Sequence, residues 1–140
     1  ATQKQLISCL AEDGICAGLL TLPWCSEDYF SRIKGLENEP EEGKRCLECF
    51  RIRLDETARI AAERGFDWFC TTLTVSSRKD AVVINAIGRE AEKKYNVKWL
   101  PSEFKKREGN HRSIILSEKY GLYRQEYCGC VFSLNGGSNE

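Results

Sequence analysis

Two pairs of closely spaced cysteines are the residues best suited to chemistry in this sequence. Cys46 and Cys49 lie three residues apart at the start of a predicted helix, so both thiols face the same side of its first turns. The helix N-terminus and the basic neighbours Lys44, Arg45 and Arg51 favour the thiolate form that binds metal. We therefore expect a thiolate-ligated metal at this pair, with chance pairing in a cysteine-rich chain as the alternative.

Cys128 and Cys130 form the second pair, and the glycine between them lets the backbone fold tightly. A disulfide between cysteines so close is strained and easily reduced, which suits redox exchange. Alternatively, both are metal ligands that join Cys46 and Cys49 in an all-thiolate shell, as in structural zinc sites and iron-sulfur centres. The remaining cysteines lack such spacing and are expected to be small buried hydrophobes: Cys9, Cys16, Cys25 and Cys70.

The bulk composition is that of an ordinary globular chain. The 140 residues are 41% hydrophobic and 30% charged, a balance that argues against a disordered chain. No apolar run approaches the roughly 20 residues of a membrane-spanning helix. We expect a single domain over residues 1–132 and a disordered tail over residues 133–140.

Cysteine usage indicates the redox compartment. Eight cysteines without a secretory signal fit metal or redox chemistry better than a secreted disulfide scaffold. We expect a reducing compartment, either the cytoplasm or an organelle interior if a cleaved targeting segment preceded Ala1. The sequence has no Met and begins at Ala1, so either its initiator was removed or the chain is a trimmed fragment.

Charge is balanced over the whole chain, with 21 Lys and Arg against 21 Asp and Glu, which excludes a global basic field for nucleic-acid binding. Basic residues still cluster locally, around the first cysteine pair and in a second run: Lys105, Lys106, Arg107, His111 and Arg112. Such runs are either solvated faces or local contacts for a polyanion. His111 is expected to be an ordinary exposed side chain in a basic loop.

Hydrophobic periodicity predicts alternating helices and strands. We expect helices over residues 3–13, 26–33, 46–64, 80–95 and 112–120, joined by an exposed acidic loop over 35–45. Strands are expected over residues 18–24, 66–75 and 97–100. The strand, helix, strand order from residue 66 to 100 predicts a right-handed βαβ unit with parallel strands, and hence an α/β domain.

Several segments together resemble the epoxyqueuosine reductase QueH family, which acts on tRNA. The matching stretches are IKGLENEPEEGKRCLECFRIRLDETA (33–58), GFDWFCTTLTVSSRKD (65–80) and FKKREGNHRSIILSEKYGLYRQEYCGC (104–130). They cover most of the chain from Tyr29 onward. The resemblance implies a Rossmann-like fold of the HUP type, a parallel sheet flanked by helices, here shortened at its N-terminus.

The resemblance also implies roles for single residues. Cys46 and Cys49 would ligate an iron-sulfur cluster of the 4Fe-4S type, with zinc as the alternative metal, and Cys128 and Cys130 would form a redox-active pair. The reaction would reduce the epoxide of epoxyqueuosine, in the tRNA anticodon loop, to queuosine. Short basic and aromatic clusters suit contact with that loop: Lys79, Lys105, Lys106, Tyr123, Arg124 and Gln125.

One part of the family pattern is missing from this sequence. The family begins with a strand that carries a CCxPC motif and supplies further cluster ligands, whereas this sequence has no adjacent cysteines. Two expectations follow. The chain is part of an epoxyqueuosine reductase, or it is a non-catalytic accessory subunit within a larger complex, with Cys46, Cys49, Cys128 and Cys130 closed around zinc or an iron-sulfur centre. The sequence does not identify the electron donor.

Overall fold

The structure, a computed structural model, describes residues 2–23, 25–106, 108–125 and 127–134. Contacts along the chain group into two units. The central unit comprises Ser26–Asn110, and the terminal unit combines residues 1–25 with residues 111–140. Both cysteine pairs lie in described residues, one pair in each unit.

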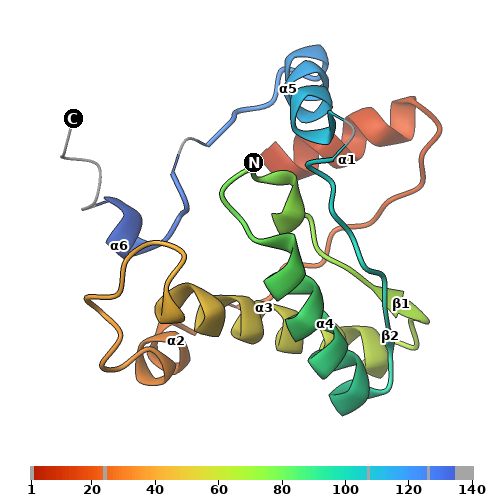
Figure 1. The fold of residues 1–140 in the computed structure, drawn as a ribbon. Helices are drawn as coiled ribbons and strands as arrows, with labels where there is room; N and C mark the ends of the chain where they lie inside the picture. Colours follow the sequence, from red (N-terminus) through yellow and green to blue (C-terminus); the bar gives the residue numbers. More distant parts are fainter. Residues whose placement is uncertain (1, 24, 107, 126, 135–140) are drawn as a thin grey trace. The chain divides into compact units, whose positions relative to one another are not determined.

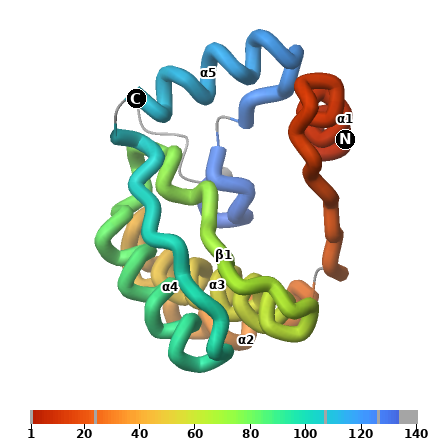
Figure 2. Tube along the Cα trace, turned by 90° about the vertical axis from the view of Figure 1, so that its right-hand side faces the viewer, coloured from red at the N-terminus to blue at the C-terminus, as the bar shows by residue number. Residues whose placement is uncertain are grey.

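The central unit contains a two-stranded parallel sheet and three α-helices. Its elements are α2 (Ser26–Arg32), α3 (Lys44–Glu63), β1 (Trp68–Phe69), the short 3-10 helix η1 (Leu73–Val75), α4 (Ala81–Tyr95) and β2 (Lys98–Trp99). Trp68 pairs with Lys98 and Phe69 with Trp99. Two perpendicular views show α3 and α4 together on one side of the strands (Figure 1, Figure 2). The predicted parallel βαβ order is confirmed by β1, α4 and β2.

The core of the central unit forms where these helices cover the sheet. Phe69 and Trp99 face inward, with ring centroids 5.0 Å apart in an edge-to-face arrangement. The helices contribute apolar side chains at helical spacing: Phe50, Leu54, Ala58 and Ala61 from α3, and Ile84, Ile87 and Ala91 from α4. On the outer face of the sheet, Phe66, Trp68 and Leu100 are exposed.

Local sequence signals explain where the main helices begin and end. Asp80 caps α4, because its Oδ1 accepts hydrogen bonds from the backbone N–H groups of Val82 (2.8 Å) and Val83 (3.4 Å). Asn96 ends α4 in a left-handed conformation, with φ +54°. Gly65, with φ +71°, follows the end of α3, as a C-terminal glycine should.

A polar network ties together the loops that follow the two strands. Asn85 of α4 accepts from Trp99 Nε1 and from the Ser102 backbone N–H, both at 3.0 Å, and its Nδ2 donates to the Ser102 carbonyl at 2.9 Å. The hydroxyls of Ser102 and Thr74 lie 3.1 Å apart in buried surroundings. These bonds fix the carboxyl edge of the sheet, where ligands bind in open α/β folds.

The terminal unit contains α1 (Thr2–Glu12), most of α5 (Gly109–Lys119) and α6 (Val131–Leu134). Gln5 of α1 donates to the Tyr120 carbonyl at 2.9 Å. Asp13 accepts from Lys119 Nζ at 2.7 Å and from the Tyr120 hydroxyl. The hydrogen bonds from Lys119 and Tyr120 stabilise the carboxylate and lower the pKa of Asp13. The bond to Asp13 in turn raises the pKa of Lys119. Polar contacts thus join α1 to the end of α5.

The helix predictions are confirmed within a few residues, whereas the strand predictions are wrong in extent. Residues 18–23 form no strand, because this apolar run is exposed and pairs with no other segment, and residue 24 lies outside the described residues. The predicted strand over 66–75 contains only the two residues of β1, followed by η1. The last long helix begins at Gly109, so His111 is exposed in α5 rather than in a loop.

The α/β class is confirmed by the parallel sheet and its helices. The single domain over residues 1–132 and the Rossmann-like HUP architecture stay predictions. Ser133 and Leu134, placed by the sequence in a disordered tail, belong to α6. The rest of that tail, residues 135–140, lies outside the described residues.

Candidate functional site

Cys46 and Cys49 occupy the first two turns of α3. Both are half-buried and neither forms a disulfide. Cys46 packs against the core of the central unit, and its Sγ accepts a hydrogen bond from the backbone N–H of Glu42 at 3.3 Å. Half-burial together with an N–H donor is a suitable setting for a thiolate ligand, since hydrogen bonds to sulfur stabilise its negative charge.

The basic residues beside this pair are directed at oxygen acceptors. Arg45 is 6% exposed, and its Nη1 donates to the carbonyls of Glu37 (2.8 Å) and Glu39 (2.6 Å) in the preceding loop. Of the two alternatives for this basic cluster, the solvated face is wrong for Arg45, because its side chain is buried and bonded to loop carbonyls. Arg51 bonds Glu48 at 2.9 Å.

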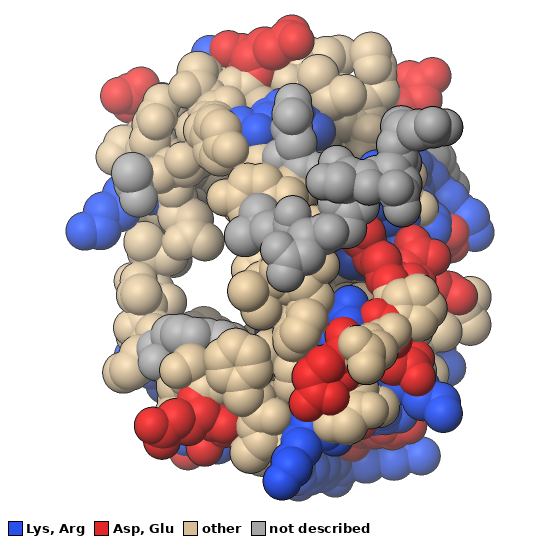
Figure 3. Space-filling model, turned by 90° about the vertical axis from the view of Figure 1, so that its left-hand side faces the viewer, with Lys and Arg blue, Asp and Glu red and all other residues tan. Residues whose placement is uncertain are grey.

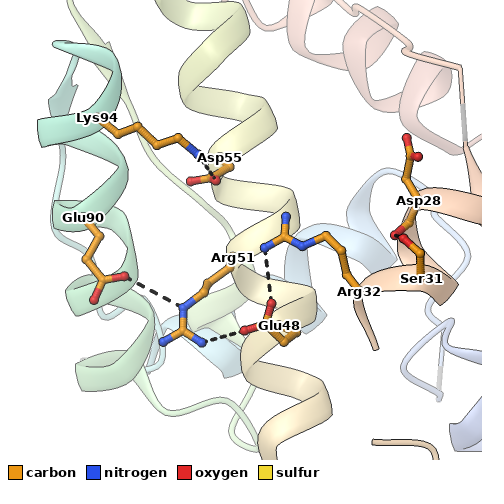
Figure 4. Close-up of polar contacts among 8 residues, drawn as sticks. All are labelled: Asp28, Ser31, Arg32, Glu48, Arg51, Asp55, Glu90 and Lys94. Atoms are coloured by element: carbon orange, nitrogen blue, oxygen red, sulfur yellow. Dashed lines mark hydrogen bonds and ion pairs between the residues drawn. The ribbon is translucent and has the colours of Figure 1, made fainter. Parts of the chain in front are cut away.

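Ion pairs connect α3 with the helices on either side. Figure 4 shows Glu48 between Arg32 and Arg51, with Arg51 directed also at Glu90 of α4. Further along the two helices, Lys94 Nζ lies 2.7 Å from Asp55 Oδ2, and this bond raises the pKa of Lys94. These side chains are partly exposed, so solvent screens the charges and each pair contributes little to stability.

Cys128 and Cys130 lie in the terminal unit, just before α6. Both are half-buried, and neither forms a disulfide. Gly129 between them has φ +66°, a left-handed conformation that glycine adopts readily, in agreement with the tight backbone expected there. The Cys130 carbonyl accepts from the backbone N–H (2.9 Å) and the hydroxyl (2.7 Å) of Ser133, which anchors the pair to α6.

The four cysteines thus divide into two pairs, one in each unit. Among the described residues, no three His, Cys, Asp or Glu side chains gather closely enough to hold one metal ion. The donor chemistry nevertheless fits a thiolate-ligated group, because each pair offers two half-buried thiols that are not joined in a disulfide. The disulfide, the cluster and the four-cysteine shell stay predictions.

The residues expected to contact the substrate in the terminal unit are exposed. Tyr123 is 68% exposed, and Arg124 and Gln125 beside it are exposed as well. Arg124 Nη1 donates to the hydroxyls of Ser113 and Ser117 of α5, both at 3.3 Å. These contacts hold Arg124 against α5 and leave the Tyr123 ring open to solvent.

The three lysines expected at the substrate lie in different settings. Lys79 is 7% exposed, with Nζ 3.7 Å from Glu41 Oε1 and 5.6 Å from the centre of the Phe50 ring. Lys105 is half-buried and donates to the Lys79 carbonyl at 3.0 Å. Lys106 is exposed and pairs with Glu103 at 2.6 Å. A buried Lys79 was not foreseeable from its basic, polar surroundings in the sequence, and the substrate roles of all three stay predictions.

Three cysteines outside the pairs contradict the expectation of burial. Cys70 directly follows β1 and is exposed, and Cys16 and Cys25 are exposed as well. The expected strand would have buried Cys70, but β1 ends at Phe69 and the side chain emerges at the carboxyl edge of the sheet. Cys9, in α1, is half-buried.

The surface carries charges of both signs. In the lower half of Figure 3, acidic and basic side chains are interspersed on the face drawn, in agreement with the balanced composition. Within the part of the chain that the structure describes, no helix is long and apolar enough to cross a membrane.

Sequence reasoning missed the role of the acidic loop before α3. The loop over residues 35–45 was expected only to be exposed and acidic, yet Glu42 donates its backbone N–H to the Cys46 thiol and Glu39 Oε2 accepts from the Lys44 N–H at 3.0 Å. Pro40 and Gly43, close together before the cysteine, were the signal of an ordered turn there.

Comparison with known proteins gives a consistent result. The family model described as Epoxyqueuosine reductase QueH matches residues 9–136. A protein of that name from Streptococcus pyogenes is 43% identical over 132 residues, covering 94% of this chain and 52% of the relative. Others are 49% identical over 103 residues in Staphylococcus epidermidis, covering 74% and 43%, and 41% over 106 residues in Thermotoga maritima, covering 76% and 55%.

The chain spans about half the length of these relatives. The matched region includes both cysteine pairs and all six residues expected at the substrate. The relatives are all named as reductases, and nothing in the comparisons supports a non-catalytic accessory subunit. Because the family model matches most of its residues, this chain belongs to the epoxyqueuosine reductase QueH family.

Proposed function

We propose that this chain carries the cluster-ligating and redox-active cysteines of an epoxyqueuosine reductase, an oxidoreductase of tRNA processing that reduces epoxyqueuosine in tRNA to queuosine. The observation that carries the proposal is the family match over residues 9–136, which includes Cys46, Cys49, Cys128 and Cys130. The names of the relatives supply the reaction. All four thiols are half-buried and none forms a disulfide, which is compatible with their use as ligands and reductants.

The thiols of Cys128 and Cys130 match the electron balance of this reaction. Removal of the epoxide oxygen breaks two C–O bonds, forms a C=C bond and releases water, which requires two electrons and two protons. Oxidation of two thiols to one disulfide supplies both. A low-potential electron donor must then reduce the disulfide to regenerate the dithiol. Gly129 allows the close approach of the two sulfurs that such a disulfide requires.

Cys46 and Cys49 are the proposed ligands of a 4Fe-4S cluster in a Rossmann-like fold of the HUP type. Such a cluster supplies electrons one at a time when bound. The chain's own contribution is to present both thiols from one rigid helix and to donate the Glu42 N–H to Cys46. Zinc is the alternative metal for the same thiolates.

The proposed macromolecular partner is the tRNA anticodon loop. The proposed compartment is the cytoplasm, because the matched relatives come from bacteria. An unpaired base can stack on an exposed aromatic ring, and Tyr123 offers one at 68% exposure. Arg124, held by Ser113 and Ser117, is positioned beside it for a phosphate. Gln125 is a further proposed contact in the terminal unit, and Lys79, Lys105 and Lys106 are the proposed contacts in the central unit.

The proposal is tested with tRNA that carries epoxyqueuosine. The chain is reconstituted anaerobically with iron and sulfide, supplied with dithionite and incubated with the tRNA, and the nucleosides are analysed by mass spectrometry. We expect a product lighter by one oxygen atom, and no product from Cys128→Ser. Cys16→Ser, which alters an exposed cysteine outside the pairs, is the matched control and should retain the activity. An unchanged nucleoside with the cluster-loaded chain would contradict the proposal.

A further inference from the structure

The loop before α3, residues 36–43, makes an ordered contact with Cys46, the first of the two proposed metal-binding thiols. We refer to these residues as the capping loop. Its Glu42 donates the backbone N–H to Cys46 Sγ at 3.3 Å. Glu42 adopts φ +70°, a left-handed conformation that side chains other than glycine rarely take. The contact therefore depends on a backbone conformation that an isolated loop would not keep.

The left-handed residue belongs to a tight turn. The Gly43 N–H donates to the Pro40 carbonyl at 3.1 Å, which places Glu42 at the third position of a β-turn, where type II turns require positive φ. A side chain at Gly43 would lie 2.7 Å from Glu39 Oε2 and 3.0 Å from the Pro40 carbonyl oxygen. A larger residue at Gly43 would therefore displace the Glu39 carboxylate, which accepts from the Lys44 N–H at the start of α3.

Two buried cations hold the rest of the capping loop. Arg45 Nη1 donates to the carbonyl of Leu36 at 3.4 Å and to those of Glu37 and Glu39. One guanidinium nitrogen thus bonds three backbone carbonyls of the loop. Lys79, buried beside the Phe50 ring, lies 3.7 Å from Glu41. The loop is thus fastened to α3 on one side and to the start of α4 on the other.

We infer that the capping loop positions the Cys46 thiolate for metal binding, with Glu42 as the donor and Arg45 as the residue that fixes the loop. The inference rests on the proposed ligation by Cys46 and Cys49. An N–H directed at sulfur orients the lone pairs and stabilises the thiolate charge, as outer-shell partners do in metal sites. Glu42 and Arg45 are positioning residues in this inference, because Glu42 acts through the Cys46 thiol and Arg45 through the loop carbonyls.

The test measures Co(II) binding by the full chain under anaerobic conditions. Affinity is obtained by competition with a chromophoric chelator, and the thiolate-to-cobalt absorption reports sulfur ligation. Glu42→Val places a β-branched residue where φ is positive, which expels the residue from the turn and removes the N–H···S bond. Glu42→Gly keeps both the turn and the N–H. The matched control is Glu108→Val, since Glu108 also has positive φ (+60°) but bonds no thiol in the described contacts.

We expect Glu42→Val to weaken Co(II) binding at least about tenfold and to change the thiolate absorption, as losses of outer-shell contacts do. Glu42→Gly and Glu108→Val should bind as the unaltered chain does. Arg45→Met should weaken binding similarly, and Arg45→Lys, which retains a cation near the carbonyls, should recover part of it. Circular dichroism establishes that the helices of each variant remain folded.

Two results would contradict the inference in different ways. Equal Co(II) affinity and absorption in Glu42→Val and the unaltered chain would overturn the role of the capping loop and leave the ligands in place. Equal binding by a Cys46→Ser, Cys49→Ser double variant would instead overturn the proposed ligation, and the positioning role with it.

Discussion

Replacing Gly88 with alanine tests the packing of α4 on the sheet, which involves Trp99 of β2. A Cβ at Gly88 would lie 2.3 Å from Trp99 Cδ2 and Cε2 and 2.7 Å from Cζ2. Carbon atoms in contact prefer about 3.5–4.0 Å, so the indole ring would have to retreat by more than about 1 Å. Trp99 is only 3% exposed and packs edge-to-face on Phe69, which leaves no space behind it.

The expected cost combines three effects. Overpacking a core costs about 1–3 kcal/mol. A shifted indole would also weaken its 3.0 Å hydrogen bond to Asn85, worth about 1 kcal/mol. Alanine recovers about 1 kcal/mol of helix propensity relative to glycine. The net destabilisation predicted for Gly88→Ala is therefore about 1–3 kcal/mol.

Urea unfolding followed by far-ultraviolet circular dichroism measures this cost. Gly18→Ala is the control, because a Cβ there would meet nothing within 4 Å and its φ is not positive. We expect a lower urea midpoint for Gly88→Ala and an unchanged midpoint for Gly18→Ala. An unchanged midpoint for Gly88→Ala would refute the close packing of α4 on Trp99.

Two further predictions concern polar contacts at helix ends. Asp80→Ala removes the cap of α4 and should destabilise the chain by about 1 kcal/mol in urea unfolding, whereas Asp80→Asn should retain most of the stability. Asp13→Asn should destabilise the chain at neutral pH, because Lys119 and Tyr120 lower the pKa of Asp13 in the folded state. That contribution is present above the ordinary aspartate pKa and is lost as the pH falls through the lowered pKa, so the difference between Asp13→Asn and the unaltered chain should vanish in acid. A difference independent of pH would contradict this assignment.

The helices could be predicted from the sequence because their signals are local. The stripe of Phe50, Leu54 and Ala58 on α3, and the Asp80 cap of α4, depend on residues within a few positions of one another. The strand over 66–75 was predicted too long because threonine favours strands in general. Here the Thr71 hydroxyl instead accepts from the Leu73 N–H at 3.2 Å, and the Thr74 hydroxyl bonds that of Ser102. Such bonds favour the turn of η1 over a longer strand. Ser102 lies far from Thr74 in the sequence, so a local sequence pattern cannot reveal this partner.

The cysteines of the candidate site could be predicted from the sequence, but the contacts that hold the surrounding loop in place could not. Spacing alone identified both cysteine pairs, and the glycine between Cys128 and Cys130 indicated the tight backbone found there. The burial of Arg45 and Lys79 was not predictable, because charged residues are usually exposed and their partners are backbone carbonyls or a glutamate from another segment. These tertiary contacts decide whether a run of charged residues is exposed to solvent or is buried and bonded to another segment.

The central claim is that Cys46 and Cys49 ligate an iron-sulfur cluster, and anomalous scattering at the iron and zinc edges tests it most directly. Crystals of the anaerobically reconstituted chain would identify the metal and locate it relative to each thiol. We predict iron within bonding distance of Cys46 Sγ and Cys49 Sγ, with sulfide and without zinc. Zinc at these thiols, or iron bound elsewhere with both thiols unligated, would contradict the claim.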